Sequence, residues 1–277
     1  MTRLRSEDIT ASARDLKAYD AELRRKVGTD LKGLACGAAG VDEGAFARRA
    51  AAVTAAVVPV TAGAGIITGF SAAVGRILTH VGLAAFVTAQ TDVAGLAEAY
   101  HRACELIFTA DDHSFVAIHT RRRRVVSNAE ATGAGFARGL DLMAGGVRGK
   151  TVLIVGCGPV GRSAAENLLA AGARIHVYDA DAAKARNLAV ELRRRSHAVA
   201  VEESVASALS RHSLILDATP AAGIIDADAV GPETCISAPG VPIGMTAAAL
   251  AKVCDRVLHD FLEIGVATMA AFCLKDG

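Results

Sequence analysis

The sequence contains no tryptophan and few other aromatic residues, with eight phenylalanines and three tyrosines among 277 residues. Few rings are therefore available to stack on nucleic-acid bases. An excess of one charge is also missing, because 30 Lys and Arg residues stand against 29 Asp and Glu residues. Proteins that bind nucleic acid by neutralising its phosphates carry a clear positive excess. The composition therefore predicts no nucleic-acid partner.

The six cysteines include no closely spaced pair of the CxxC kind. This spacing argues against a zinc ribbon and against a framework of disulfides. The opening segment, MTRLRSEDIT, has no apolar run of the kind that a signal peptide requires. Reduced cysteines and the missing signal sequence together predict a cytoplasmic location.

A long stretch without charge, residues 50–75, raises the question of a membrane span. Pro59, Gly63, Gly65 and Gly69 interrupt the middle of this stretch. A short buried strand, a Gly-rich turn and a helix explain the pattern better than one spanning helix. We therefore expect no association with a membrane.

The residues that are present describe an ordered α/β chain, since 52% are hydrophobic and 21% are charged. In the first half, apolar strand-like runs alternate with segments of helical period, which is typical of a parallel sheet. The expected helices are 6–27, 43–56, 66–80 and 92–104, and the expected strands are 57–60, 84–88 and 106–110. The arginine run from Arg121 to Arg124 is typical of a solvated hairpin turn, with a nucleic-acid patch as the alternative.

A Gly-rich segment at 144–150 marks a domain boundary. We predict an N-terminal α/β substrate domain at 1–146, which begins with helices, and a C-terminal Rossmann domain at 147–277. The second domain is expected to contain strands at 151–156, 174–179, 197–201, 213–218, 234–237 and 256–259, helices at 159–171 and 182–195, and a final helix. The apolar final helix, 264–274, fits either a core or the interface of a homodimer.

The most informative motif is the sequence GCGPVG at 156–161, which follows a buried strand and precedes an amphipathic helix. Gly156 permits a tight turn, Gly158 lets the backbone approach a diphosphate, and Gly161 allows the helix to pack on the strand. The helix start, to which Pro159 and Val160 belong, offers a partial positive charge and the free N–H groups of its non-proline residues to the phosphates. The alternatives are a glycine turn without a ligand and an FAD site.

Asp179 ends the next strand, at the position where an acid accepts hydrogen bonds from the adenosine ribose. A carboxylate there would repel a 2′-phosphate, so we expect NAD rather than NADP as the cofactor. The loops that contain Thr219, Pro220 and Pro239 follow two further strands and are expected to line the nicotinamide end of the site. The alternative is that proline and glycine only terminate these strands.

The first half offers two features for a substrate. The Gly-rich turn within 57–71 could present backbone N–H groups to a substrate carboxylate. Asp111, at the end of a strand, could hold a cationic amine or accept its proton, although such an Asp also caps turns. We expect no metal site, because Asp112 and His113 lack further ligands and the histidines, His176 and His212 included, show no ligand spacing.

Several segments resemble one enzyme family across most of the chain. They are VPVTAGAGIITGFS at 58–71, ADDHSF at 110–115, GCGPVG at 156–161, DATP at 217–220, APG at 238–240 and IGVATM at 264–269. These segments are similar to those of the pyrrolysine-biosynthesis dehydrogenases, the PylD family. The segments at 58–71 and 110–115 are specific to that family, whereas the glycine motif is general.

The resemblance implies a reaction and a set of roles. Members oxidise the terminal amine of 3-methylornithyl-Nε-lysine with NAD, and the resulting semialdehyde closes a ring to give pyrrolysine. By this resemblance Asp111 is the catalytic residue, and its carboxylate contacts the amine. The residues expected to bind the isopeptide substrate are Leu4, Val60, Thr61, Ala62, Phe70, Ser71 and Asn128.

Two other functions remain open at this point. The chain could be another NAD-dependent dehydrogenase, acting on an amino acid or on methylene-tetrahydrofolate. It could also be a protein that binds NAD(H) as a sensor without turnover. A DNA-binding helix-turn-helix with a basic face would favour a sensor, and we find none in the sequence.

Overall fold

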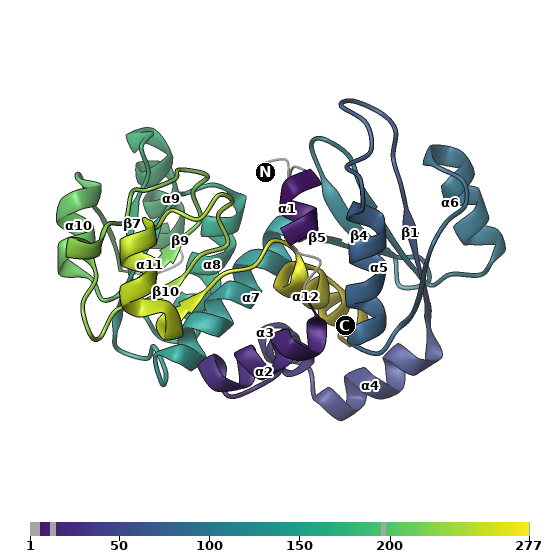
Figure 1. Cartoon of the computed structure of the whole chain (residues 1–277), viewed down its shortest axis with the longest axis horizontal. Helices are drawn as coiled ribbons and strands as arrows, with labels where there is room; N and C mark the ends of the chain where they lie inside the picture. Colours follow the sequence, from purple (N-terminus) through teal and green to yellow (C-terminus); the bar gives the residue numbers. More distant parts are fainter. Residues whose placement is uncertain (1–5, 12–14, 195–197, 277) are drawn as a thin grey trace. The chain divides into compact units, whose positions relative to one another are not determined.

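A computed structural model describes residues 6–11, 15–194 and 198–276 (Figure 1). The chain divides into two compact units. The first unit comprises residues 1–24, 29–135 and 261–277, and the second comprises 25–28 and 136–260. The predicted domains, 1–146 and 147–277, differ from these units at both ends of the second domain.

The first unit is built on a five-stranded sheet in the order β2-β1-β3-β4-β5. Its strands are β1 (Thr54–Val58), β2 (Ala84–Val87), β3 (Leu106–Ala110), β4 (Phe115–His119) and β5 (Arg124–Ser127). The strands β1, β2 and β3 are parallel, as predicted, whereas β4 and β5 join antiparallel. The short hairpin loops between β3, β4 and β5 leave no room for a crossover, which explains the change of direction.

The helices of this unit are α1 (Ser6–Ala11), α2 (Leu16–Val27), α3 (Leu31–Ala39), α4 (Glu43–Ala52), α5 (Phe70–His80), α6 (Asp92–His101) and α12 (Glu263–Leu274). Aspartates cap two of them, because Asp30 accepts the N–H of Gly33 and Asp42 accepts that of Ala45. Within the predicted helix 6–27 the described residues form α1 and α2, and the predicted helix 43–56 ends at Ala52. Alanine-rich sequence carries little information about where a helix passes into a strand, so β1 begins earlier than expected.

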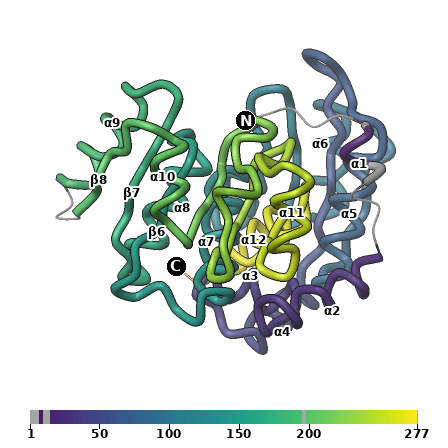
Figure 2. The backbone as a smooth tube through the Cα atoms, turned by 60° about the vertical axis from the view of Figure 1, so that its left-hand side comes forward, coloured from purple at the N-terminus to yellow at the C-terminus, as the bar shows by residue number. Residues whose placement is uncertain are grey.

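The last helix of the chain, α12, belongs to the core of the first unit and not to the Rossmann domain. Every residue of α12 except Phe272 is buried. The helix packs against α3, α5, β4 and β5, and Figures 1 and 2 show it alongside α3. Of the two expected places for this helix, a core or a dimer interface, the structure shows the core.

The arginine run forms the β4–β5 hairpin turn, as predicted, but it is not only solvated. Arg122 Nη1 donates to the Lys275 carbonyl at 2.8 Å, and Arg124 Nη1 donates to the Phe272 carbonyl at 2.8 Å. Arg49 Nη1 donates to the Leu274 carbonyl at 2.7 Å. These three cations satisfy carbonyl groups at the C-terminal end of α12, where the helix dipole is negative.

The second unit contains a fully parallel six-stranded sheet in the Rossmann order β11-β10-β9-β6-β7-β8. Its strands are β6 (Thr151–Val155), β7 (Arg174–Tyr178), β8 (Val199–Val201), β9 (Leu214–Asp217), β10 (Cys235–Ser237) and β11 (Val257–Leu258). Its helices are α8 (Pro159–Ala170), α9 (Ala182–Arg194), α10 (Val205–Arg211) and α11 (Ala247–Val253), with 3-10 turns η1 (Ala227–Ala229) and η2 (Cys254–Arg256). The order of predicted strands is confirmed, and the α/β fold class is confirmed with it.

The sequence analysis missed α7 (Asn128–Met143), in which the boundary between the units falls. Glycines within α7 obscure its helical pattern, yet close packing explains them. A Cβ at Gly135 would lie 2.4 Å from the Ile264 side chain, and one at Gly139 would lie 2.2 Å from that of Leu258. No helix among the described residues is long and apolar enough to cross a membrane.

Candidate functional site

The glycine loop of the second unit begins where β6 ends. Gly156 has a φ of 95°, which favours glycine, and a Cβ there would lie 2.9 Å from the backbone of Ala218. A Cβ at Gly161 would lie 1.9 Å from the Gly156 carbonyl oxygen. Any side chain at either position would therefore distort the contact between the loop, β9 and α8.

Gly158 differs from its two neighbours, because a Cβ at this position meets no atom within 4 Å. Gly158 is the N-cap of α8, and Pro159 and Val160 form the first helical turn. Among the described residues, no side chain caps this helix start. Open space beside Gly158 and uncapped N–H groups at a positive helix end are what a bound diphosphate requires.

Asp179 follows β7 and lies against this loop. Its Oδ2 accepts the Cys157 N–H at 2.7 Å, and its Oδ1 accepts the Asp181 N–H at 2.9 Å. Burial, with the charge of Asp179 as a smaller cause, raises the pKa of the Cys157 thiol to about 12. Cys157 is therefore a neutral thiol in the loop and not a nucleophile.

Asp217 organises the loops that follow β9 and β10. Its side chain is fully buried, and its Oδ1 accepts the Thr219 N–H at 3.1 Å and the Thr219 hydroxyl at 2.8 Å. Gly240 N donates to the Asp217 carbonyl at 3.1 Å, and a Cβ at Gly240 would lie 2.0 Å from the Thr219 carbonyl oxygen. Burial raises the pKa of the Asp217 carboxyl to about 6. These contacts hold Thr219 at the C-terminal edge of the sheet, where ligands of this fold bind.

Pro220 and Pro239 lie in the same two loops, after β9 and β10 respectively. Pro220 is exposed and Pro239 is half-buried. Both follow the C-terminal ends of neighbouring strands, which is the position expected for residues that line a dinucleotide site.

The Gly-rich loop of the first unit, residues 59–69, is held by two aspartates. Asp92 Oδ1 accepts the Thr61 N–H at 2.8 Å, and Asp92 Oδ2 accepts the Thr61 hydroxyl at 2.6 Å. Asp112 Oδ2 accepts the Ala64 N–H at 2.7 Å. A Cβ at Gly63 would lie 2.1 Å from Asp112 Oδ2, so the loop approaches this carboxylate where only glycine fits.

These bonds revise the expectation that the loop binds an anionic group. The N–H groups of Thr61 and Ala64 already point at carboxylates of the protein. Hydrogen bonds from Thr61 hold the pKa of Asp92 below its usual value, so this carboxylate is ionised at neutral pH. The loop is thus surrounded by negative charge, which favours a cationic group over a carboxylate.

Asp111 is exposed at the end of β3 and makes a tight turn. Its Oδ1 accepts the N–H groups of His113 at 2.8 Å and Ser114 at 2.7 Å. These bonds hold the pKa of the Asp111 carboxyl below its usual value. The side chain therefore caps the turn, which is one of the two roles that the sequence indicates for it. An ionised and exposed carboxylate is also available to attract an ammonium group.

The remaining predicted substrate residues lie in different surroundings. The Phe70 and Phe115 rings meet edge to face at 5.3 Å, which joins the start of α5 to the β3–β4 turn. Val60 and Ser71 are half-buried, and Ala62 is exposed. Asn128 directs its amide to the Met269 sulfur at 3.4 Å. Leu4 lies outside the described residues.

The sequence analysis missed two features of polar chemistry. Asp92, which fixes Thr61, stands at a polar helix start and resembles an ordinary cap in the sequence. His176, Glu202 and His212 converge in the second unit, although their separation in sequence resembles no ligand motif. The pairing of β7 with β8 brings His176 near Glu202, and His212 reaches them from the end of α10.

Comparison with known families agrees with the geometry of the second unit. Residues 144–226 match a family model described as NAD(P)-binding. A parallel sheet of Rossmann order with an open glycine loop defines the class: the chain is an α/β protein whose second unit is a Rossmann domain for a nicotinamide dinucleotide.

Residues 8–126 match the N-terminal domain of the pyrrolysine biosynthesis protein PylD. The chain is 30% identical to the pyrrolysine synthase of Methanosarcina acetivorans over 97% of its own length and 98% of that protein. It is 29% identical to the pyrrolysine synthase of Methanosarcina barkeri, with 97% of each chain covered. The chain belongs to the PylD family.

Solved structures of low sequence identity share the fold. Quinate dehydrogenase from Corynebacterium glutamicum in complex with NAD aligns with a TM-score of 0.55 at 15% identity, covering 79% of this chain and 93% of that one. Shikimate 5-dehydrogenase from Thermus thermophilus, in complex with NADP(H) and shikimate, aligns with a TM-score of 0.52 at 19% identity, covering 79% and 91%. One of these structures holds NAD and the other NADP(H), so this likeness does not distinguish the two cofactors.

Proposed function

We propose that this protein is an NAD-dependent amine dehydrogenase that forms pyrrolysine from 3-methylornithyl-Nε-lysine. One observation carries the proposal: a single chain joins an open dinucleotide loop to a PylD-type unit whose loops are lined with carboxylates. The pyrrolysine synthases named above support the choice of substrate. The carboxylates support an amine as the group that is bound.

The first step of the proposed reaction is the loss of a proton from the terminal ammonium to solvent water. Hydride can leave the carbon only when the nitrogen lone pair is free to form the new C=N bond. NAD supplies the hydride acceptor, and the product of this step is an iminium ion. Water adds to the iminium carbon, and ammonia leaves to give a semialdehyde. The aldehyde then condenses with the α-amine of the same molecule, releasing water and closing a five-membered ring.

We assign Asp111 the role of holding and orienting the amine. Its lowered pKa makes it a weak base, so electrostatic attraction of the ammonium is its main contribution. Asp92 and Asp112 position the loop that contains Thr61 and Ala64, and they add negative charge to the first unit. Val60, Ala62, Phe70, Ser71 and Asn128 stay as proposed substrate contacts, together with Leu4.

Substitution of Asp111 tests this role. We expect D111N to keep the turn, because an amide oxygen can still accept the N–H groups of His113 and Ser114. The loss of charge should lower kcat/KM for the isopeptide by about 100-fold, in the range of a group that acts directly on the reacting atoms. The assay follows NADH absorbance, with NADH affinity as the control for folding. Near-normal turnover would remove Asp111 from the mechanism.

We propose NAD rather than NADP because Asp179 follows β7 and lies against the glycine loop, where its carboxylate would repel a 2′-phosphate. D179N tests this choice, since its amide oxygen can still accept the Cys157 N–H. The variant should bind NAD less tightly and discriminate less against NADP, by roughly 10-fold in each affinity. Titration of the reduced cofactors by fluorescence measures both. Tighter binding of NADPH than NADH by the unmodified protein would contradict the assignment.

The turnover assay also distinguishes the two alternative functions. Oxidation of free amino acids, with no activity on the isopeptide, would identify another dehydrogenase. Tight NADH binding without turnover on any amine would identify a sensor.

A further inference from the structure

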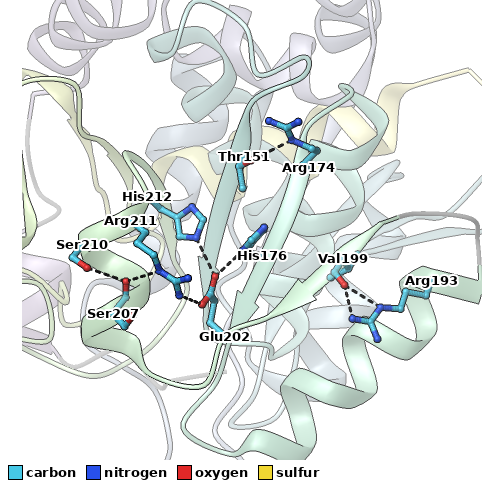
Figure 3. A network of polar contacts seen from close by, with 10 residues as sticks. All are labelled: Thr151, Arg174, His176, Arg193, Val199, Glu202, Ser207, Ser210, Arg211 and His212. Atoms are coloured by element: carbon cyan, nitrogen blue, oxygen red, sulfur yellow. Dashed lines mark hydrogen bonds and ion pairs between the residues drawn. The ribbon is translucent and has the colours of Figure 1, made fainter.

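A cluster of two histidines and one glutamate lies in the second unit, away from the glycine loop in sequence (Figure 3). His176 lies on β7, Glu202 follows β8, and His212 follows α10. Glu202 Oε1 is 2.7 Å from His176 Nδ1 and 3.1 Å from His212 Nε2. All three ligand atoms lie within 4.8 Å of one another.

We propose that His176, Glu202 and His212 form a binding site for a divalent transition-metal ion, with Zn²⁺ as the best match. Two imidazole nitrogens and one carboxylate oxygen are a ligand set that zinc uses in sites with an open fourth position. A water molecule would complete the coordination.

The distances in the cluster are close to those that a metal needs. Zinc binds nitrogen and oxygen at about 2.0–2.2 Å, so tetrahedral ligand atoms lie roughly 3.3 Å apart. The observed separations of 2.7 and 3.1 Å are slightly shorter. A small outward rotation of the side chains would admit the ion without a change in the backbone.

The protonation of the cluster also suits a metal. Burial of the Glu202 carboxyl raises its pKa, but hydrogen bonds from His176 and His212 and the charge of Arg211 outweigh this effect, so its pKa is lowered. The carboxylate is therefore ionised. Each neutral imidazole has one N–H and one lone pair, so a shift of its proton to the other ring nitrogen turns the lone pair toward the ion.

The cluster is accessible from one side. The side chain of His176 is 31% exposed, whereas those of His212 and Glu202 are 10% and 7% exposed. The two imidazole rings meet edge to face with centroids 4.7 Å apart. An ion can enter past His176, while the two inner ligands are held in place.

Arg211 is the neighbour that opposes a cation. Its guanidinium forms an ion pair with Glu202 Oε2, the carboxylate oxygen that the histidines do not contact (Figure 3). Its Nε also donates to the Ser207 carbonyl at 3.1 Å. The pair orients the carboxylate with Oε1 toward the histidines, but the positive charge weakens metal binding. Removal of this charge should therefore tighten the site.

The alternative is that the cluster is a purely structural network. Glu202 links β7 to α10 through hydrogen bonds, and β8 pairs with β7 alone. In that case the histidines act only as donors to the carboxylate. A metal titration separates the two interpretations, because a structural network has no stoichiometric affinity for an ion.

The experiment titrates the metal-free protein with Co²⁺, whose visible absorption reports four-coordinate binding. Cys254 is an exposed free thiol, so the C254S variant serves as the parent and removes a competing ligand. We expect one Co²⁺ per chain, displaced by Zn²⁺, and loss of the absorption in H176A and in H212A. H101A, which removes an exposed histidine from α6, should bind as the parent does.

A second variant, R211Q, leaves all three proposed ligands in place. We expect it to bind Co²⁺ about 10-fold more tightly than the parent, since one repelling charge is removed. Circular dichroism and NADH affinity verify that each variant is folded. Absence of one-to-one binding in the parent and in R211Q, or equal binding by H176A, would overturn the proposal. These outcomes do not depend on the amine dehydrogenase activity.

Discussion

Asp111 and Asp217 both end parallel strands, yet their surroundings move their pKa values in opposite directions. Asp111 is exposed and accepts two backbone N–H groups, which favour its charged form. Asp217 is buried, and burial favours its neutral form. The same residue type is therefore suited to attract a cation in one unit and to organise a loop in the other.

The raised pKa of Asp217 predicts a pH dependence of stability. Between about pH 4 and pH 6 the folded protein retains a proton on Asp217 that the unfolded chain has released. The free energy of unfolding therefore loses up to about 3 kcal/mol from this group as the pH rises through that range. D217N has no charge to bury, so its stability relative to the unmodified protein should increase from pH 4 to pH 7.

Urea unfolding at pH 4 and pH 7 measures this difference. A constant offset from the altered contacts of the amide cancels in the comparison of the two pH values. D226N, at an exposed carboxylate that caps η1, is the matched control for the exchange of a carboxylate for an amide. Equal pH dependence for D217N and the unmodified protein would show that folding does not raise the pKa of Asp217.

At the scale of elements, the turn from β6 into α8 has to satisfy two different requirements. Packing within the protein requires glycine at positions 156 and 161, because a Cβ at either position would meet backbone atoms. Packing does not require a glycine at position 158, because a Cβ there meets no atom within 4 Å, and we propose that a diphosphate approaches the backbone at this residue. A pair of alanine variants separates these requirements.

We expect G158A to fold with a melting temperature close to that of the unmodified protein but to bind NADH at least about 10-fold more weakly, since its methyl group occupies the approach of the diphosphate. G161A should lose several kcal/mol of stability through the clash with the Gly156 carbonyl. Thermal unfolding and NADH titration of both variants make the comparison. Unchanged NADH affinity in G158A would place the diphosphate elsewhere.

Strands and the glycine loop were predictable because their signals are local. A buried apolar run, the sequence GCGPVG and a later Asp together indicate the first strand, turn and helix of a Rossmann domain. The structure contains this strand and helix as β6 and α8. The environment of the 59–69 loop was not predictable, since it depends on Asp92 and Asp112 reaching it from other segments. The helix α7 was missed because its glycines are explained only by the residues of α12 and β11 that they contact.

At the scale of the whole chain, sequence order and structural units do not coincide. The last helix, α12, returns to the core of the first unit, and residues 25–28 belong to the second. A division at 146 and 147 follows from the glycines of the connecting segment, but long-range packing decides the actual units. The cluster of His176, Glu202 and His212 likewise needs three separate segments, which no spacing in the sequence indicates.

We propose that one chain oxidises the amine and that ring closure follows from this oxidation. Incubation with 3-methylornithyl-Nε-lysine and excess NAD, followed by quantification of NADH, ammonia and the product by mass spectrometry, tests it most directly. We expect one NADH, one ammonia and one pyrrolysine for each isopeptide consumed. NADH formed without release of ammonia, or no pyrrolysine at all, would contradict it.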